Sequence, residues 1–226
     1  MHSQKTTAIL LFAESAKVQA SKKRLLEDAD GNFRLFQKFN HQRLKTLKKS
    51  GFDYFHFDES GQEGNSFDQK IATATDRILR KGYERIIVIG SDSPDLSERD
   101  LWQANRLLDD QDIVLGPDMR GGLYLIALKK QAFNRDSFQS LQWQSSALRS
   151  SFVAYAKSGS CDVSWLRWKA DFNKMAEVMH YWKVSKVLRK IIGRLFSSGY
   201  RLIGVLNMLP SLLLITEHSR RGPPNR

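Results

Sequence analysis

The sequence "RIIVIGSDSPDLSERDL", residues 85–101, joins an apolar run to an acidic turn and then to a helical pattern. The run RIIVI predicts a buried strand, because five residues dominated by Ile and Val suit a sheet covered on both faces. Asp92 and Asp95 follow within the turn. Ser97 with Asp100 three residues later predicts a capped helix start. This stretch therefore predicts a strand, a loop and a helix, with carboxylates where the strand ends.

The same alternation of short apolar runs and amphipathic segments extends over most of the chain. It predicts an α/β fold, a three-layer sandwich with a mostly parallel sheet and helices on both faces. In such sheets ligands bind beyond the carboxyl ends of the strands, where Asp92 and the turn at 116–122 fall. The strands are predicted at residues 7–13, 53–58, 85–89, 112–115 and 123–128, and the helices at 32–49, 66–81 and 97–108.

Two features of this edge are open to two interpretations each. Asp92 either meets a metal ion or ligand, for which carboxylate oxygens are suited, or caps the turn. For Asp95 we favour capping. In "DIVLGPDMRGGLYLIAL", residues 112–128, Gly121 and Gly122 either admit a ligand against bare backbone or satisfy a hairpin turn.

Composition predicts one globular domain with an appendage. The chain has 226 residues, of which 41% are apolar, enough for one packed core. Its single cysteine, Cys161, forms no internal disulfide, which favours a reducing compartment. Residues 1–7 are polar and the apolar run after them is too short for a signal peptide. We therefore expect a cytoplasmic protein.

The net charge of +12 is concentrated near the C-terminus. Residues 1–180 carry 27 basic and 23 acidic side chains, whereas residues 181–226 carry nine basic side chains and one acid. We therefore predict a globular domain over 1–180 and a basic, apolar tail over 181–226. Nucleic-acid binding is not expected, because no reading motif and no interleaved aromatic residues accompany the charge.

The tail combines an apolar stripe with a basic face. Apolar residues recur at helical spacing over 184–196, opposite lysines and arginines. The apolar run 202–216 is too short to span a bilayer. Two interpretations remain. Residues 182–216 attach peripherally to an anionic membrane surface, namely the inner face of the membrane, or the helix packs its apolar stripe on the domain.

Six segments, in order, resemble motifs of one family. The family is the glycosyltransferase-like proteins called selenodomain-associated transferase 1, of the nucleotide-diphospho-sugar transferase superfamily, with the type A glycosyltransferase fold. The resemblance covers about residues 6–178. The segments are "FAESAKVQASKKRL" (12–25), "GNSFDQKI" (64–71), "GSDSPDL" (90–96), "GPDMRGGLYLIAL" (116–128), "WQSSAL" (143–148) and "DFNKMAEV" (171–178).

The resemblance implies a transferase acting on a nucleotide or nucleotide sugar, by glycosyl or nucleotidyl transfer, with Mg²⁺ or Mn²⁺ bridging the phosphates. It implies that Asp92 holds the metal, with Asp171 or Asn173 as its second protein ligand, and that Asp92 and Arg120 are catalytic. A cation near the departing diphosphate lowers the barrier by neutralising its developing charge. The substrate-binding residues it implies are Lys22, Arg24, Asn65, Gly121, Gly122, Trp143 and Ser145.

The chain also departs from the family pattern. Arg120 and the uncharged Asn173 each stand where the family has an acid. Ala16 and Gln19 stand where it has a proline and a glycine. An added cation and missing carboxylates weaken a divalent-metal site. Either Arg120 binds phosphate itself, or Asp118 substitutes for the missing acid. The alternative function is a catalytically impaired nucleotide- or sugar-binding module, tethered peripherally to membrane.

Overall fold

Six strands form one sheet at the centre of the molecule. The computed structural model describes residues 5–170, 185 and 189–193. The strands are β1 (Lys5–Phe12), β2 (Asp53–Phe57), β3 (Tyr83–Ile89), β4 (Ile113–Pro117), β5 (Leu123–Lys129) and β6 (Val163–Trp165). Their order across the sheet is β2-β1-β3-β5-β4-β6. Three neighbouring pairs are parallel, and β5 runs antiparallel to both β3 and β4.

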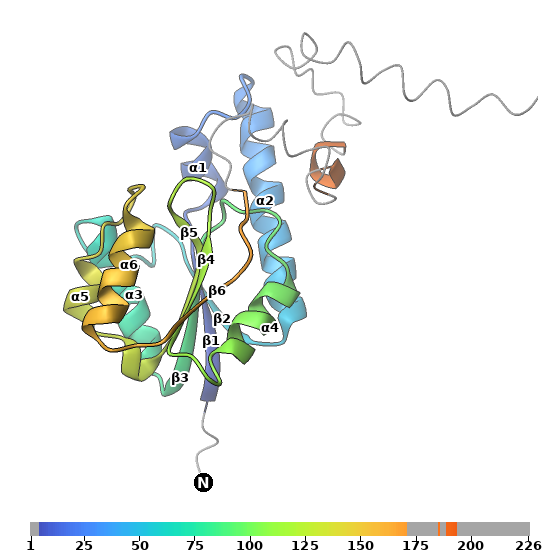
Figure 1. The fold of residues 1–226 in the computed structure, drawn as a ribbon. Helices are drawn as coiled ribbons and strands as arrows, with labels where there is room; N and C mark the ends of the chain where they lie inside the picture. Colours follow the sequence, from blue (N-terminus) through green and yellow to red (C-terminus); the bar gives the residue numbers. More distant parts are fainter. Residues whose placement is uncertain (1–4, 171–184, 186–188, 194–226) are drawn as a thin grey trace, which may run out of the picture.

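Helices cover both faces of the sheet, so the molecule has three layers (Figure 1). The helices are α1 (Ala16–Lys22), α2 (Ala29–Ser50), α3 (Phe67–Leu79), α4 (Glu98–Leu107), α5 (Arg135–Gln139) and α6 (Leu148–Ser158), with the short 3-10 helix η1 (Lys130–Ala132). Helices α3, α5 and α6 pack on one face, and α2 and α4 on the other. The α/β three-layer fold predicted from the sequence is confirmed.

The apolar runs of the strands fill two cores, one on each face. Successive side chains of a strand point to opposite faces. Leu10 of β1 accordingly joins the cluster under α3, whereas its neighbours Ile9 and Leu11 join the cluster under α2 and α4. All three are at most 2% exposed. Burial on both faces explains why these strands read as continuous apolar runs.

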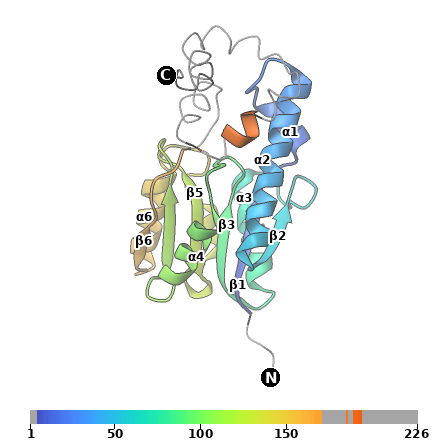
Figure 2. The ribbon, with the colours of Figure 1, turned by 90° about the vertical axis from the view of Figure 1, so that its right-hand side faces the viewer.

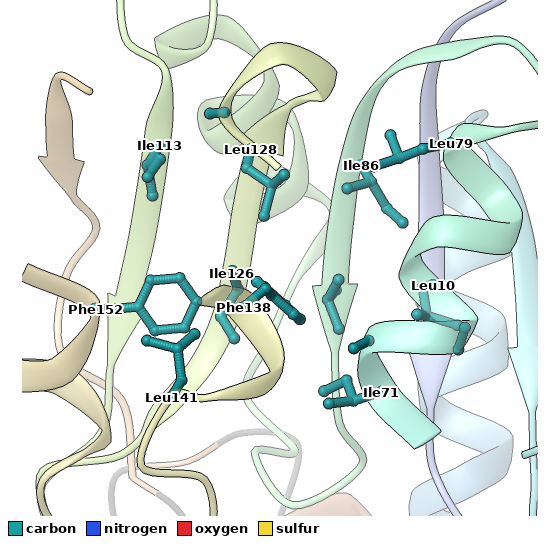
Figure 3. Packing of buried hydrophobic residues seen from close by; sticks show 14 of the residues in the cluster. Leu10, Ile71, Leu79, Ile86, Ile113, Ile126, Leu128, Phe138, Leu141 and Phe152 are labelled. Atoms are coloured by element: carbon teal, nitrogen blue, oxygen red, sulfur yellow. The ribbon is translucent and has the colours of Figure 1, made fainter. Parts of the chain in front are cut away.

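Aromatic packing under α5 and α6 anchors the first core. Phe138 and Phe152 belong to the same buried cluster as the sheet residues Ile113 and Ile126, and Figure 3 shows them among its side chains. The two rings are fully buried and meet edge to face, with centroids 5.9 Å apart and an interplanar angle of 84°. This is a favoured geometry for aromatic pairs.

Each strand and helix predicted from the sequence is present, with its ends moved by a few residues. Ser97 begins α4 as predicted, and its backbone N–H donates to the Asp100 carboxylate at 2.7 Å. The segment after β1, for which the sequence pattern predicts no helix, forms helix α1. Its N-cap Ser15 accepts a hydrogen bond from the Val18 backbone N–H.

A third apolar cluster lies beyond the carboxyl ends of the strands, between α2 and residues 189–193 (Figure 2). Ile191 and Ile192 are 7% and 1% exposed in this cluster, where they join Phe36 and Phe39 of α2. This part of the tail helix therefore packs on the domain. The other residues of 171–226, including the predicted boundary at 180, lie outside the described ones, apart from Ser185.

Within residues 5–170 and the two short pieces that follow, none of the helices combines the length and the apolar character that crossing a bilayer requires.

The aromatic core provides a test on a single helix, α6. Phe152→Ala should lower the free energy of unfolding by about 3–5 kcal/mol, because a fully buried ring leaves a cavity. The adjacent Val153 is 47% exposed, so Val153→Ala should change it by less than about 0.5 kcal/mol. Urea denaturation measures both. Equal losses for the two variants would contradict the packing described here.

Candidate functional site

A cavity of about 810 Å³ opens at the edge of the sheet where β1 and β3 end. Because β5 is antiparallel, its first residues reach the same edge. Phe12 of β1, Ile89 of β3 and Leu123 of β5 all line the cavity. The topology therefore brings three loops of distant sequence around one space, at the edge predicted to bind a ligand.

Charged side chains of both signs line this cavity. They come from the segment before α1, from the end of α1, from the loop after β3 and from the turn between β4 and β5. Among the described lining residues, the acids are Glu14, Asp92 and Asp118, and the bases are Lys22, Lys23 and Arg120.

One ion pair among these charges joins the segment after β1 to the loop after β3. The Lys23 ammonium lies 2.7 Å from Asp92 Oδ2. The Lys23 side chain is 28% exposed and that of Asp92 43%, so the pair faces the cavity and is partly shielded from water. Lys22 forms a similar ion pair with Glu14, but its own side chain is 60% exposed.

A buried arginine holds the loop that carries Asp92. Arg43 of α2 is 3% exposed and donates hydrogen bonds to the carbonyl oxygens of Ser93 and Leu96. Burial lowers the pKa of Arg43 to about 10, a shift opposed by the charges of Asp100 and Asp92. The guanidinium therefore stays charged at pH 7. Its Nε finds no hydrogen-bond partner in the described part of the chain.

The turn between β4 and β5 is organised by Asp118, which is 7% exposed. Its Oδ1 accepts hydrogen bonds from the backbone N–H groups of Arg120 and Gly122, each at 2.8 Å. Gly121 has a φ of +89°, and a Cβ there would lie 2.3 Å from the carbonyl oxygen of Ser146. The turn interpretation holds for Gly121. Gly122 lines the cavity, and a Cβ there would lie 2.3 Å from Asp118 Oδ2. The ligand interpretation of the two glycines stays a prediction.

The structure brings together six of the residues predicted for the site. They line the cavity from α1 to the segment before α6, and they are Lys22, Asp92, Arg120, Gly122, Trp143 and Ser145. The Trp143 indole N–H donates to the carbonyl oxygen of Phe138 at 2.9 Å, which fixes the ring beside Phe67.

Three other predicted residues, Gly121, Arg24 and Asn65, do not line the cavity. The Arg24 guanidinium donates to the carbonyl oxygen of Glu27 at 2.9 Å. The Asn65 backbone N–H donates to the Gln69 side chain at 3.0 Å. The roles predicted for Asp171 and Asn173 fall outside the described residues.

The described residues do not fit a divalent-metal site. A metal such as Mg²⁺ or Mn²⁺ requires several oxygen ligands. Across residues 5–170, 185 and 189–193, no group of three His, Cys, Asp or Glu side chains is placed to hold a metal. The three cavity carboxylates already accept from Lys22, from Lys23 and from backbone N–H groups.

Residues 34–145 match the family model described as "Uncharacterized protein conserved in bacteria (DUF2064)". The narrower resemblance to selenodomain-associated transferase 1 stays a prediction. Comparison with curated proteins finds no match.

Solved structures share the fold at low sequence identity. A candidate nucleotide-diphospho-sugar transferase from Desulfovibrio desulfuricans G20 superposes with a TM-score of 0.70 and 19% identity, over 85% of this chain and 97% of that one. Rv0371c from Mycobacterium tuberculosis H37Rv, in complex with manganese, has a TM-score of 0.45 and 13% identity, over 80% of this chain and 100% of that one. The first of these likenesses supports the fold class predicted from the sequence.

The β4–β5 turn predicts a sharp difference between two glycines. Gly121→Ala should lower the free energy of unfolding by at least about 1–2 kcal/mol, because alanine is strained at positive φ and its Cβ would meet the Ser146 carbonyl oxygen. At Gly90 a Cβ would meet open space, so Gly90→Ala should be nearly neutral. Thermal unfolding of the two variants tests this, and a neutral Gly121→Ala would show that the turn lacks the described conformation.

The buried arginine predicts a local effect as well as a global one. Arg43→Met should lower the free energy of unfolding by about 2–3 kcal/mol, because two buried carbonyl oxygens lose a charged donor. Amide hydrogen exchange in residues 91–97 should also accelerate. Lys45→Met, on an exposed position of α2, is the control and should change neither quantity. Unchanged exchange in the Arg43 variant would mean that other contacts hold the loop.

Proposed function

We propose that this protein is a transferase that binds a nucleotide or nucleotide sugar in the 810 Å³ cavity and transfers its glycosyl or nucleotidyl group. The observation that carries the proposal is the grouping of Lys22, Lys23 and Arg120 around one cavity at the strand ends. A diphosphate needs cations of this kind near its oxygens, the lysines as compact charges and the arginine as a planar fork.

The rest of the cavity suits the uncharged parts of such a ligand. Phe67 and Trp143 form an apolar wall, with ring centroids 5.8 Å apart. Ligand sites commonly combine apolar walls with a few placed polar groups. Ser145 and Gly122 line the same space and supply polar backbone or side-chain atoms for a sugar or base.

The proposed chemistry needs little more than charge and position. In glycosyl transfer an acceptor oxygen forms a bond to the anomeric carbon while the bond from that carbon to the diphosphate oxygen breaks. In nucleotidyl transfer an acceptor oxygen forms a bond to the α-phosphorus while the bond from that phosphorus to the pyrophosphate oxygen breaks. A hydroxyl acceptor loses its proton to solvent. Either leaving group departs with developing negative charge. Preorganised cations stabilise that charge because they need no reorientation during the reaction.

A second candidate is a binding module without turnover. It is favoured because all three cavity acids already have partners. Glu14 and Asp92 form ion pairs, and Asp118 accepts backbone hydrogen bonds. A carboxylate engaged in this way is a weaker general base. Peripheral membrane attachment through 182–216 and a cytoplasmic location stay predictions.

A thermal-shift screen of nucleotides and nucleotide sugars tests the proposal, with a matched pair of variants on α1. Binding at about 100 times Kd adds about 2.7 kcal/mol of apparent stability, so at least one compound should raise Tm by several degrees. Lys22→Glu should abolish the shift because Lys22 lines the cavity. Lys17→Glu, the same charge change at an exposed position outside the described lining, should leave it intact.

Three results discriminate the alternatives. No shift with any compound, with or without Mn²⁺, would contradict nucleotide binding altogether. Equal loss in both variants would point to diffuse electrostatic attraction in place of a site. Phosphorus NMR with candidate acceptors separates a transferase from a binding module. A transferase releases nucleoside diphosphate from a nucleotide sugar or pyrophosphate from a nucleoside triphosphate, whereas a binding module releases neither.

A further inference from the structure

We infer that Lys23 supplies the cation that a divalent metal would otherwise provide, so that this site binds a diphosphate group without a metal ion. The inference deepens the proposed function and rests on it. It concerns the class of ligand: the free diphosphate, in place of its magnesium or manganese complex.

The position of Lys23 is fixed by its backbone as well as by its charge. It caps the C-terminus of α1, where its N–H donates to the Gln19 carbonyl oxygen at 2.8 Å. Its own carbonyl oxygen accepts from the side-chain amide of Asn32 at 2.9 Å, and Asn32 is 3% exposed. The ammonium therefore starts from an anchored main chain, and Asp92 sets the direction of its end.

The Lys23 ammonium contacts one of the two Asp92 oxygens that could bind a metal. An ion pair of 2.7 Å leaves Oδ2 in direct contact with a cation. A divalent ion bound to this oxygen would lie beside the ammonium or displace it, and like charges at such distances repel strongly. Arg120 lines the same cavity and adds positive charge.

The other cavity acids do not offset this repulsion. Asp118 directs Oδ1 to two backbone N–H groups of the β4–β5 turn, and Glu14 is paired with Lys22. Over the described residues, no trio of metal-ligating side chains compensates for them. The disagreement between this donor set and a divalent ion is the basis of the inference.

A lysine ammonium can do the work required at this point. It has three N–H donors. One is directed to Asp92, which leaves two for phosphate oxygens in the cavity. The Asp92 carboxylate then orients the Lys23 ammonium, as it would orient a bound metal ion.

The test is calorimetric titration of the full chain with inorganic pyrophosphate, once in EDTA and once in MnCl2. Pyrophosphate should bind in EDTA, and it should bind no more tightly in MnCl2, because Mn²⁺ complexes the ligand and lowers its free concentration. In EDTA, Lys23→Met should weaken binding at least about tenfold, because a charged donor to the ligand is lost. Lys23→Arg, which keeps the charge, should retain most of the affinity, and Lys17→Met should be unchanged.

A second readout follows Mn²⁺ itself, by the electron paramagnetic resonance signal of the free ion. Without pyrophosphate, the unaltered protein should leave that signal unchanged. This expectation does not depend on whether the Lys23→Met variant takes up the ion. Circular dichroism confirms that each variant is folded, and if Lys23→Met is not, Lys23→Gln replaces it.

Each contrary result overturns a distinct statement. Pyrophosphate binding that requires Mn²⁺, uptake of Mn²⁺ by the unaltered protein, or a Lys23→Met variant that binds as well as the parent would overturn the role of Lys23 and leave nucleotide binding standing. Absence of binding in both buffers, together with a negative nucleotide screen, would overturn the proposed function itself.

Discussion

The hydrogen bonds from the buried Arg43 guanidinium to the loop after β3 are the constraint on which the site depends. Residues 90–97 form no regular element, so their carbonyl groups need partners other than a helix or strand. Arg43 supplies two of these partners, at Ser93 and Leu96. A charge held at 3% exposure is costly, and it is retained here where several acids surround it. The position of Asp92 follows from this arrangement.

The antiparallel strand β5 is the second constraint. A parallel strand at the same place would begin at the opposite edge and carry the β4–β5 turn away from the cavity. Because β5 runs antiparallel beside β3, Leu125 pairs with Ile89 and the turn before it reaches the loop of Asp92. Asp118 then stiffens the turn through its bonds to Arg120 and Gly122. The site is thus assembled from a mixed sheet, with one reversed strand contributing one wall.

Local patterns were enough to predict most of the fold. The apolar runs predicted the central strands because both faces of the sheet are buried, and the Ser97–Asp100 pair predicted the start of α4 because capping is local. Helix α1 escaped prediction because it has seven residues and little apolar periodicity. Gly121 and Gly122 were predicted from the sequence for the same reason as the start of α4, because the residues that favour a turn are adjacent in sequence.

The pairing of Lys23 with Asp92 could not be read in the same way, since 69 residues separate them. Arg43 did leave a signal: it shares a helical face with Phe36, Phe39 and Leu47, all buried, and a lone arginine on such a face must find partners inside the protein. Which partners it finds depends on the packing of α2 against the loop after β3. Contacts between residues so distant in sequence are therefore established only by the three-dimensional structure.

The net charge changes near residue 180, but residues on the two sides of this boundary pack against each other. Ser185 donates a hydrogen bond to Asp95 at 2.5 Å, in the same loop to which Arg43 donates. Ile192 is buried against the residues of α2 that flank the same region. Side chains from the basic tail thus contact both the loop of Asp92 and the helix that supports it. The described part of the tail is accordingly a component of the domain's packing, and its effect on the site acts through Asp95 and α2.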